Sequence, residues 1–226
     1  MLLDPLQLTG RSRSHVFQSD EPRFAIHADV VEPFARMREA AAREGLDIAV
    51  FSGFRDFESQ ADIWNRKFCG ERTLFDAGGG ALDYHALSEA ERMQCILNWS
   101  ALPGASRHHW GTDIDVYDRA ALPEGYRVKL LPGETQPGGI FHRLHQWLDR
   151  NMACFGFFRP YREYRGGTFP EAWHLSYAPI AMPALEALSM DVVAQALRDG
   201  DVLGKDLVLE RLPEIYRRHI LNISMP

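Results

Sequence analysis

Residues 106–115 decide how this sequence is to be interpreted, and they read Ser106-Arg107-His108-His109-Trp110-Gly111-Thr112-Asp113-Ile114-Asp115. His108 and Asp115 stand seven residues apart on either side of Gly111, so a turn at the glycine would aim an imidazole and a carboxylate at one point. Both are ligand types that suit Zn²⁺. Asp115 lies among apolar residues of a predicted strand, where a carboxylate needs a partner because an isolated buried charge is very costly. Taken alone, the stretch is also typical of a polar turn before a strand.

A second informative stretch lies at residues 169–177, which read Phe169-Pro170-Glu171-Ala172-Trp173-His174-Leu175-Ser176-Tyr177. Glu171 and His174 are three residues apart, so in a regular strand their side chains would point to opposite faces. Pro170, however, favours a turn before the strand. Such a turn would let Glu171 lie at the mouth of the strand and swing towards His174.

Together the two stretches offer three metal ligands, namely His108, Asp115 and His174. Two imidazoles and one carboxylate leave a fourth position open for water, which is the pattern of a catalytic zinc site. Zinc lowers the pKa of water that it binds to about 7. Glu171 would then act as the general base that takes the proton and later passes it to the leaving amine.

The rest of the chain predicts an α+β fold, in which helices pack around a small antiparallel sheet. Helical periodicity is found at 28–44, 57–68, 88–99, 140–152 and in the C-terminal third. Short strands are predicted at 46–51, 112–117, 155–161 and 172–177. We expect a single domain over residues 1–226, with a core at about 25–180 and a helical extension at 181–226.

Three segments lack clear periodicity. Residues 1–22 are mixed and polar, and we expect them to form an arm lying over the domain. Residues 70–87 contain three consecutive glycines, and residues 118–139 are rich in proline and glycine. Because long loops inside a compact domain tend to be binding elements, we expect these two segments to determine which substrate is accepted.

Composition places the chain among ordinary globular proteins. It has 226 residues, 25 Lys plus Arg against 31 Asp plus Glu, and a net charge of −6. This balance lacks the basic footprint of a nucleic-acid binder, so no nucleic-acid partner is expected. No apolar run is long enough for a membrane segment. The N-terminus shows no signal peptide, so we expect a cytoplasmic protein, or a periplasmic one if the chain is trimmed.

Taken together, the motifs resemble those of the zinc D-alanyl-D-alanine peptidases, a group that includes the vancomycin-resistance dipeptidases and carboxypeptidases. The resemblance rests on Ser106-x-His108-x-x-Gly111-x-Asp113-x-Asp115, on Glu171-x-Trp173-His174, and on Ser52-Gly53-Phe54-Arg55 followed by Gln60. In the third motif, Phe54 replaces the commoner Tyr. The resemblance covers residues 25–180 and implies a fold shared with lysostaphin-type peptidases and the hedgehog signalling domain.

The resemblance also implies roles for individual residues. His108, Asp115 and His174 would bind zinc, and Glu171 would be the catalytic base. Arg55 would polarise the scissile carbonyl and hold the oxyanion, where its permanent charge stabilises the transition state more than the ground state. The remaining implied residues are Gln60, Ser106 and Ser52, which would bind substrate, and Trp173, which would pack behind the metal ligands.

One residue departs from the family pattern, which usually has a small residue where this chain has Asp113. Asp113 and Asp115 share one face of the predicted strand. Asp113 is therefore open to three interpretations: an acceptor that orients a ligand imidazole, a partner of Arg107, or a competitor of Asp115 for the metal.

The function that the resemblance implies is a zinc metallopeptidase of the D-alanyl-D-alanine carboxypeptidase type. It would use zinc-bound water and Glu171 to cleave a D-amino-acid-containing peptidoglycan peptide or muropeptide. Two alternatives are a non-catalytic, zinc-stabilised binding module and a cell-wall endopeptidase of the endolysin type. A base and an oxyanion partner have no purpose in a scaffold, which favours the enzyme. Both D,D and L,D specificity stay open, as do dipeptide and longer substrates.

Overall fold

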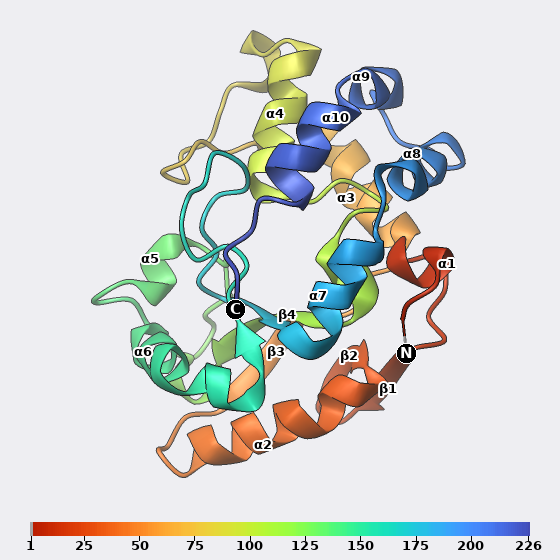
Figure 1. Ribbon diagram of the computed structural model, residues 1–226. Helices are drawn as coiled ribbons and strands as arrows, with labels where there is room; N and C mark the ends of the chain where they lie inside the picture. The colour runs from red at the N-terminus through yellow and green to blue at the C-terminus, as the bar shows by residue number, and fades with distance from the viewer. Residues whose placement is uncertain (1) are drawn as a thin grey trace.

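The fold is organised around a four-stranded antiparallel sheet with the strand order β3-β4-β6-β5. A computed structural model describes residues 2–226, and it confirms the predicted α+β class (Figure 1). The strands of this sheet are β3 (Ile48–Ser52), β4 (Asp113–Asp118), β5 (Phe157–Phe158) and β6 (His174–Tyr177). β4 and β6 lie side by side with Asp115 opposite His174, so the two informative stretches of sequence meet in the middle of the sheet.

The helices lie around this sheet at nearly the predicted positions (Figure 1). Their bounds are α1 (Pro5–Leu8), α2 (Val31–Ala42), α3 (Phe57–Phe68), α4 (Glu89–Trp99), α5 (Pro132–Thr135), α6 (His142–Asn151), α7 (Ala178–Ala187), α8 (Met190–Arg198), α9 (Lys205–Glu210) and α10 (Leu212–Ile215). Side-chain caps set two of the starts: Asp56 accepts from Ser59 N before α3, and Ser88 forms a capping box with Glu91 before α4. No single helix within residues 2–226 is long and apolar enough to span a membrane, and the pair α7–α8 that reaches this length together is bent by 76°.

The N-terminal segment, expected to form an arm lying over the domain, has regular structure that its sequence pattern did not predict. Residues 16–27 form a two-stranded antiparallel hairpin, β1 (Val16–Asp20) with β2 (Arg23–His27). Its first strand is largely exposed, so it carries no run of apolar residues to reveal it in the sequence. The backbone N–H of His27 donates to the carbonyl oxygen of Gly111 at 2.8 Å, which fastens the hairpin to the turn before β4.

The two loops predicted to be binding elements do approach the candidate site. The 70–87 segment holds one isolated bridge, between Phe75 and Ala81, and a short 3₁₀ turn η2 (Tyr84–Ala86). The 118–139 connection holds the 3₁₀ turn η4 (Arg119–Ala121) and α5. Phe75 from the first segment and residues 129–131 from the second line one cavity, which is described below.

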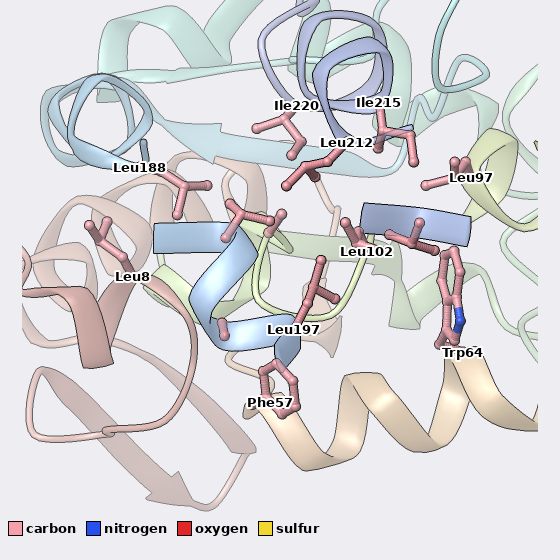
Figure 2. Close-up of a cluster of buried hydrophobic side chains, with 14 of the residues drawn as sticks. Leu8, Phe57, Trp64, Leu97, Leu102, Leu188, Leu197, Leu212, Ile215 and Ile220 are labelled. Atoms are coloured by element: carbon pink, nitrogen blue, oxygen red, sulfur yellow. The ribbon is translucent and has the colours of Figure 1, made fainter. Parts of the chain in front are cut away.

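Apolar side chains are buried in two clusters, one on each side of the sheet region. The smaller cluster joins the sheet to α2 and α6. The larger cluster joins α3 and α4 to the C-terminal helices α7–α10. Figure 2 shows Phe57 and Trp64 of α3 pointing into this larger cluster, with Phe57 next to Leu197 of α8. The C-terminal extension therefore shares its core with the helix that leads out of the Ser-Gly-Phe-Arg motif.

This shared core predicts that the extension stabilises the whole chain. Leu197 is fully buried, so Leu197→Ala should lower the free energy of unfolding by about 2–5 kcal/mol, through lost burial and the cavity left behind. Leu203 is 41% exposed, and the matched Leu203→Ala change should cost less than about 0.5 kcal/mol. Urea unfolding followed by circular dichroism measures both. Equal stabilities for the two variants would contradict a shared core.

Candidate active site

A cavity of about 270 Å³ opens where β6 begins beside β4. Its walls come from distant parts of the chain: α3, the end of α4, residues 129–131, and the C-terminal π-helical turn η6 (Tyr216–Ile220). Of the predicted site residues, Arg55, Ser106, His108, Asp115, Glu171, Trp173 and His174 line it. The structure thus gathers in one place residues that are up to 119 positions apart, from Arg55 to His174.

His108, Asp115 and His174 form a tight buried cluster, called here the metal-ligand group because it could hold a metal ion. One nitrogen or oxygen atom from each residue lies within 4.8 Å of the other two. Asp115 and His174 face the same side because they are register partners in antiparallel strands. His108 comes from the 3₁₀ turn η3 (Arg107–Trp110), and Gly111 ends that turn with a positive φ of 65°. A side chain at Gly111 would lie 2.6 Å from the backbone nitrogen of His27, so only glycine permits this turn.

Hydrogen bonds hold both imidazoles in defined orientations. His108 Nδ1 lies 2.9 Å from the carbonyl oxygen of Gly53, to which it donates, so its Nε2 faces Asp115 Oδ2 at 3.4 Å as an acceptor. His174 Nε2 donates to Asp113 Oδ1 at 2.9 Å, so its Nδ1 faces Asp115 Oδ1 at 3.1 Å. Each imidazole therefore presents one nitrogen to the carboxylate of Asp115.

These residues fit a metal ion. Asp115 Oδ1 is buried and forms no hydrogen bond, although His174 Nδ1 lies 3.1 Å away. Two acceptors this close, inside a buried group, require a positive charge between them. The same demand is evident in His174: burial opposes its charge, yet the carboxylates of Asp113 and Asp115 raise its pKa to about 10. A set of two nitrogens and one oxygen suits Zn²⁺.

Asp113 takes both of the non-ligand roles left open by the sequence. Its Oδ1 accepts from Arg107 Nε at 2.7 Å and from His174 Nε2 at 2.9 Å. Its Oδ2 accepts from Thr112 Oγ1 at 2.7 Å and from Ser176 Oγ at 3.0 Å. Asp113 is fully buried, and although burial opposes its charge, Arg107 and these donors hold the pKa of its carboxyl well below the usual value. Both oxygens are occupied, so of the two aspartates it is Asp115 that could bind a metal.

Glu171 lies beside His174, with its Oε2 3.4 Å from His174 Nδ1. The predicted turn is present: His174 N–H donates to the carbonyl oxygen of Glu171 at 3.2 Å, and Glu171 N–H donates to that of Tyr161 at 2.9 Å. Burial raises the pKa of Glu171 to about 7, and the nearby Asp115 charge acts in the same direction. The carboxyl group is thus held at the edge of the metal-ligand group, facing the cavity.

Arg55 is fixed by side chains for which the sequence implied another role. Its Nη1 donates to Gln60 Oε1 at 2.7 Å and its Nη2 donates to Ser52 Oγ at 2.9 Å. Gln60 is fully buried and uses its Nε2 to donate to the carbonyl oxygen of Ala101 at 2.8 Å. Gln60 and Ser52 thus contact Arg55 in the structure, and their implied contacts with substrate stay a prediction.

Two other implied residues lie at the cavity wall. Ser106 is buried, and its Oγ has no hydrogen-bond partner among the described residues. Trp173 is buried next to the metal-ligand group, and its carbonyl oxygen accepts from Val116 N–H at 3.0 Å, which holds β6 against β4. Ser106 thus has a hydroxyl group without a protein partner at the cavity, whereas Trp173 forms part of the cavity wall.

Tyr161 and Lys67 are among the cavity-lining residues that the sequence did not predict. The ring of Tyr161 packs edge-on against His174, with 5.1 Å between the ring centroids. Lys67 is on α3, seven residues after Gln60, which is two helical turns and the same side of the helix. That spacing is the signal that would have pointed to Lys67.

Comparison with known proteins places this site within a stretch of chain that matches one protein family. The VanY D-alanyl-D-alanine carboxypeptidase family matches residues 23–180. An uncharacterized protein of Haemophilus influenzae is 34% identical over 122 residues, which are 53% of this chain and 93% of that protein. The D-alanyl-D-alanine carboxypeptidase of Enterococcus faecalis is 28% identical over 145 residues, 63% of this chain and 44% of that protein.

A solved structure extends the likeness to the fold. It is a mutant of the vancomycin resistance D,D-pentapeptidase VanY from a VanB-type cassette, in complex with Zn(II). The TM-score is 0.51 at 22% identity, over 76% of this chain and 83% of that one. At this identity, the match shows that the two proteins share a fold.

The buried network around Asp113 predicts a large effect on stability. Asp113→Asn keeps the shape of the side chain but leaves Arg107 as a buried, uncompensated charge, so the free energy of unfolding should fall by about 3–5 kcal/mol. Thr112→Val removes one hydrogen bond from the same carboxylate while keeping the shape of the side chain, and should cost about 1.5–3 kcal/mol. Denaturant titrations of both variants measure the difference. An Asp113→Asn protein as stable as the parent would refute this account of the network.

Proposed function

We propose that this chain, which belongs to the VanY family of D-alanyl-D-alanine carboxypeptidases, removes the C-terminal residue of peptidoglycan peptides with the help of a zinc ion. The chain carries the carboxypeptidase domain of the family. We infer the zinc ion and the roles of individual residues from the geometry of the site. The observation that supports them best is the convergence of His108 Nε2, His174 Nδ1 and Asp115 on one point beside Glu171.

His108, Asp115 and His174 would hold the zinc ion. When bound there, zinc supplies Lewis acidity, which lowers the pKa of water at the site and polarises a carbonyl oxygen. Asp113 serves the site by accepting from His174 Nε2, so that the opposite nitrogen, Nδ1, would be the one that binds the metal. The carbonyl oxygen of Gly53 does the same for His108.

Glu171 would act as the general base. Its carboxylate borders both the cavity and the metal-ligand group, which is where a water molecule must lose a proton as it attacks the scissile carbonyl. The same carboxyl can then deliver the proton to the amine of the departing residue. Because this group lies within reach of both reacting partners, one side chain serves both proton transfers.

Arg55 would stabilise the negative charge that develops on the carbonyl oxygen. Gln60 and Ser52 hold its guanidinium in place before substrate arrives, so little reorganisation is needed in the transition state. Ser106, with its unpartnered hydroxyl in the cavity, would hydrogen-bond the substrate. A base and a positioned cation beside the metal-ligand group argue against a purely non-catalytic binding module.

The first test of the proposal is cleavage of synthetic stem peptides ending in D-Ala-D-Ala or L-Lys-D-Ala, with zinc present. We expect release of the C-terminal residue. Glu171→Gln should lower kcat by about 10²–10⁴, because it removes the proton acceptor while keeping the shape. Glu163→Gln, an exposed and surface-paired glutamate, is the matched control and should keep full activity. Cleavage of none of these peptides, or equal rates for the parent and Glu171→Gln, would refute the proposal.

The second test concerns the metal. Purified protein should bind about one zinc ion per chain, and treatment with a chelator should abolish cleavage until zinc is returned. His108→Ala should lose the bound zinc, because it removes one of three ligands. His85→Ala changes an exposed histidine and should leave the zinc content unchanged. Elemental analysis of the three proteins decides. A His108→Ala protein with the parent's zinc content would exclude this ligand group.

A further inference from the structure

Lys67 is a cation of the cavity wall that none of the roles above uses. The side of α3 that faces the cavity carries Ile63 and Lys67, one turn apart, and Gln60 precedes them on the same side. Lys67 Nζ donates to Ser100 Oγ at 2.6 Å. Within residues 2–226, no carboxylate oxygen lies within 4.0 Å of this nitrogen. The ammonium group therefore reaches the cavity without an anionic partner.

The surroundings of Lys67 make this lack of a partner costly. Burial lowers the pKa of Lys67 to about 8, and the positive charges of Arg72 and Arg55 act in the same direction, opposed by Glu171. An ammonium group has three N–H donors, of which the bond to Ser100 uses one. Desolvated cations with free donors are stabilised most by an anion that accepts from them.

The chemistry of the neighbouring wall points to a carboxylate as that anion. Ser106 lines the same cavity and has a buried, unpartnered hydroxyl. One ammonium and one hydroxyl together provide donors for the two oxygens of a carboxylate. A second lysine, Lys129, also lines the cavity, but its side chain is exposed.

We propose that Lys67 binds the C-terminal carboxylate of the substrate and thereby restricts the enzyme to peptides with a free C-terminus. This inference rests on the proposed function, because it assigns the leaving residue to the Lys67 side of the cavity. Consecutive Cα atoms are about 3.8 Å apart, so the terminal carboxylate lies within one residue of the scissile bond. Arg55 is held by Gln60 and Ser52 for the oxyanion, and Arg107 is paired with Asp113. Because Lys129 is exposed, Lys67 is the partly buried cation of the lining that is left for the carboxylate.

The consequence is discrimination against peptides that lack a terminal charge. A peptide whose C-terminus is amidated, or continues into a further residue, would leave the ammonium of Lys67 desolvated and without an anion. Losing a hydrogen bond to a charged group lowers affinity by about tenfold to a hundredfold. The cavity would therefore favour removal of a terminal residue over cleavage within a cross-linked wall.

The test compares two peptides that differ only at their end, one with a C-terminal D-Ala-D-Ala carboxylate and the other with the corresponding amide. The parent should prefer the carboxylate by about tenfold to a hundredfold in kcat/KM. Lys67→Met should bring the ratio close to one, mainly through a higher KM for the carboxylate peptide, and Lys67→Arg should restore part of the preference. Lys205→Met removes a charge from α9, outside the cavity wall, and should keep the parent's ratio.

Three results would overturn the proposal: no preference in the parent, an unchanged preference in Lys67→Met, or an equal loss of kcat on both peptides. The last result would mean that Lys67 acts through Glu171 or through the fold. Calorimetric binding of both peptides to the parent and to Lys67→Met separates this proposal from the proposed function. If no peptide is cleaved but the parent still binds the carboxylate more tightly and Lys67→Met does not, only the proposed function fails. If Lys67→Met does not fold, as judged by thermal melting, Lys67→Gln replaces it.

Discussion

The carboxylate of Asp113 connects the chain segments that form the site. It is fully buried and accepts from Arg107 on η3, from Thr112 just before β4, and from His174 and Ser176 on β6. A buried carboxylate is tolerated only when its charge is paired and its lone pairs are used. The cost of breaking any of these contacts therefore keeps the turn and the two strands in one arrangement. The same arrangement orients His174, so one network provides both the rigidity of the site and the orientation of a candidate metal ligand.

A second set of contacts connects the metal-ligand group to Arg55. The backbone N–H of Arg55 donates to the carbonyl oxygen of His108 at 3.1 Å, and His109 Nδ1 donates to that of Arg55 at 2.7 Å. Gly53, two residues earlier, approaches the hairpin so closely that a Cβ would lie 2.2 Å from the carbonyl oxygen of Ala25. The Ser-Gly-Phe-Arg motif is thus held between β2 and η3. Such fixed positions suit a site whose charges must be in place before the reaction.

Much of the fold was predictable because its signals are local. The start of α4 at Ser88 and the whole of α3 follow from capping residues and helical periodicity, and both agree with the structure. The β1–β2 hairpin was missed because its strands are short and partly exposed, so hydrophobic alternation is weak. The strand predicted at 155–161 shrinks to Phe157–Phe158, because Gly156 with its positive φ ends the preceding turn and pairing with β6 begins only after it.

Residue type and spacing along the chain predicted His108, Asp115, Glu171 and His174 as a candidate group. The structure brings these four side chains together. Which polar side chains support them was settled only in three dimensions. Asp113 meets His174 across 61 residues, and Gln60 meets Ala101 across 41. Contacts of this range depend on strand register and on the angles at which helices pack, which are global properties of the folded chain. For that reason the contact of Gln60 with Arg55 and the place of Lys67 in the cavity wall emerged only from the folded structure.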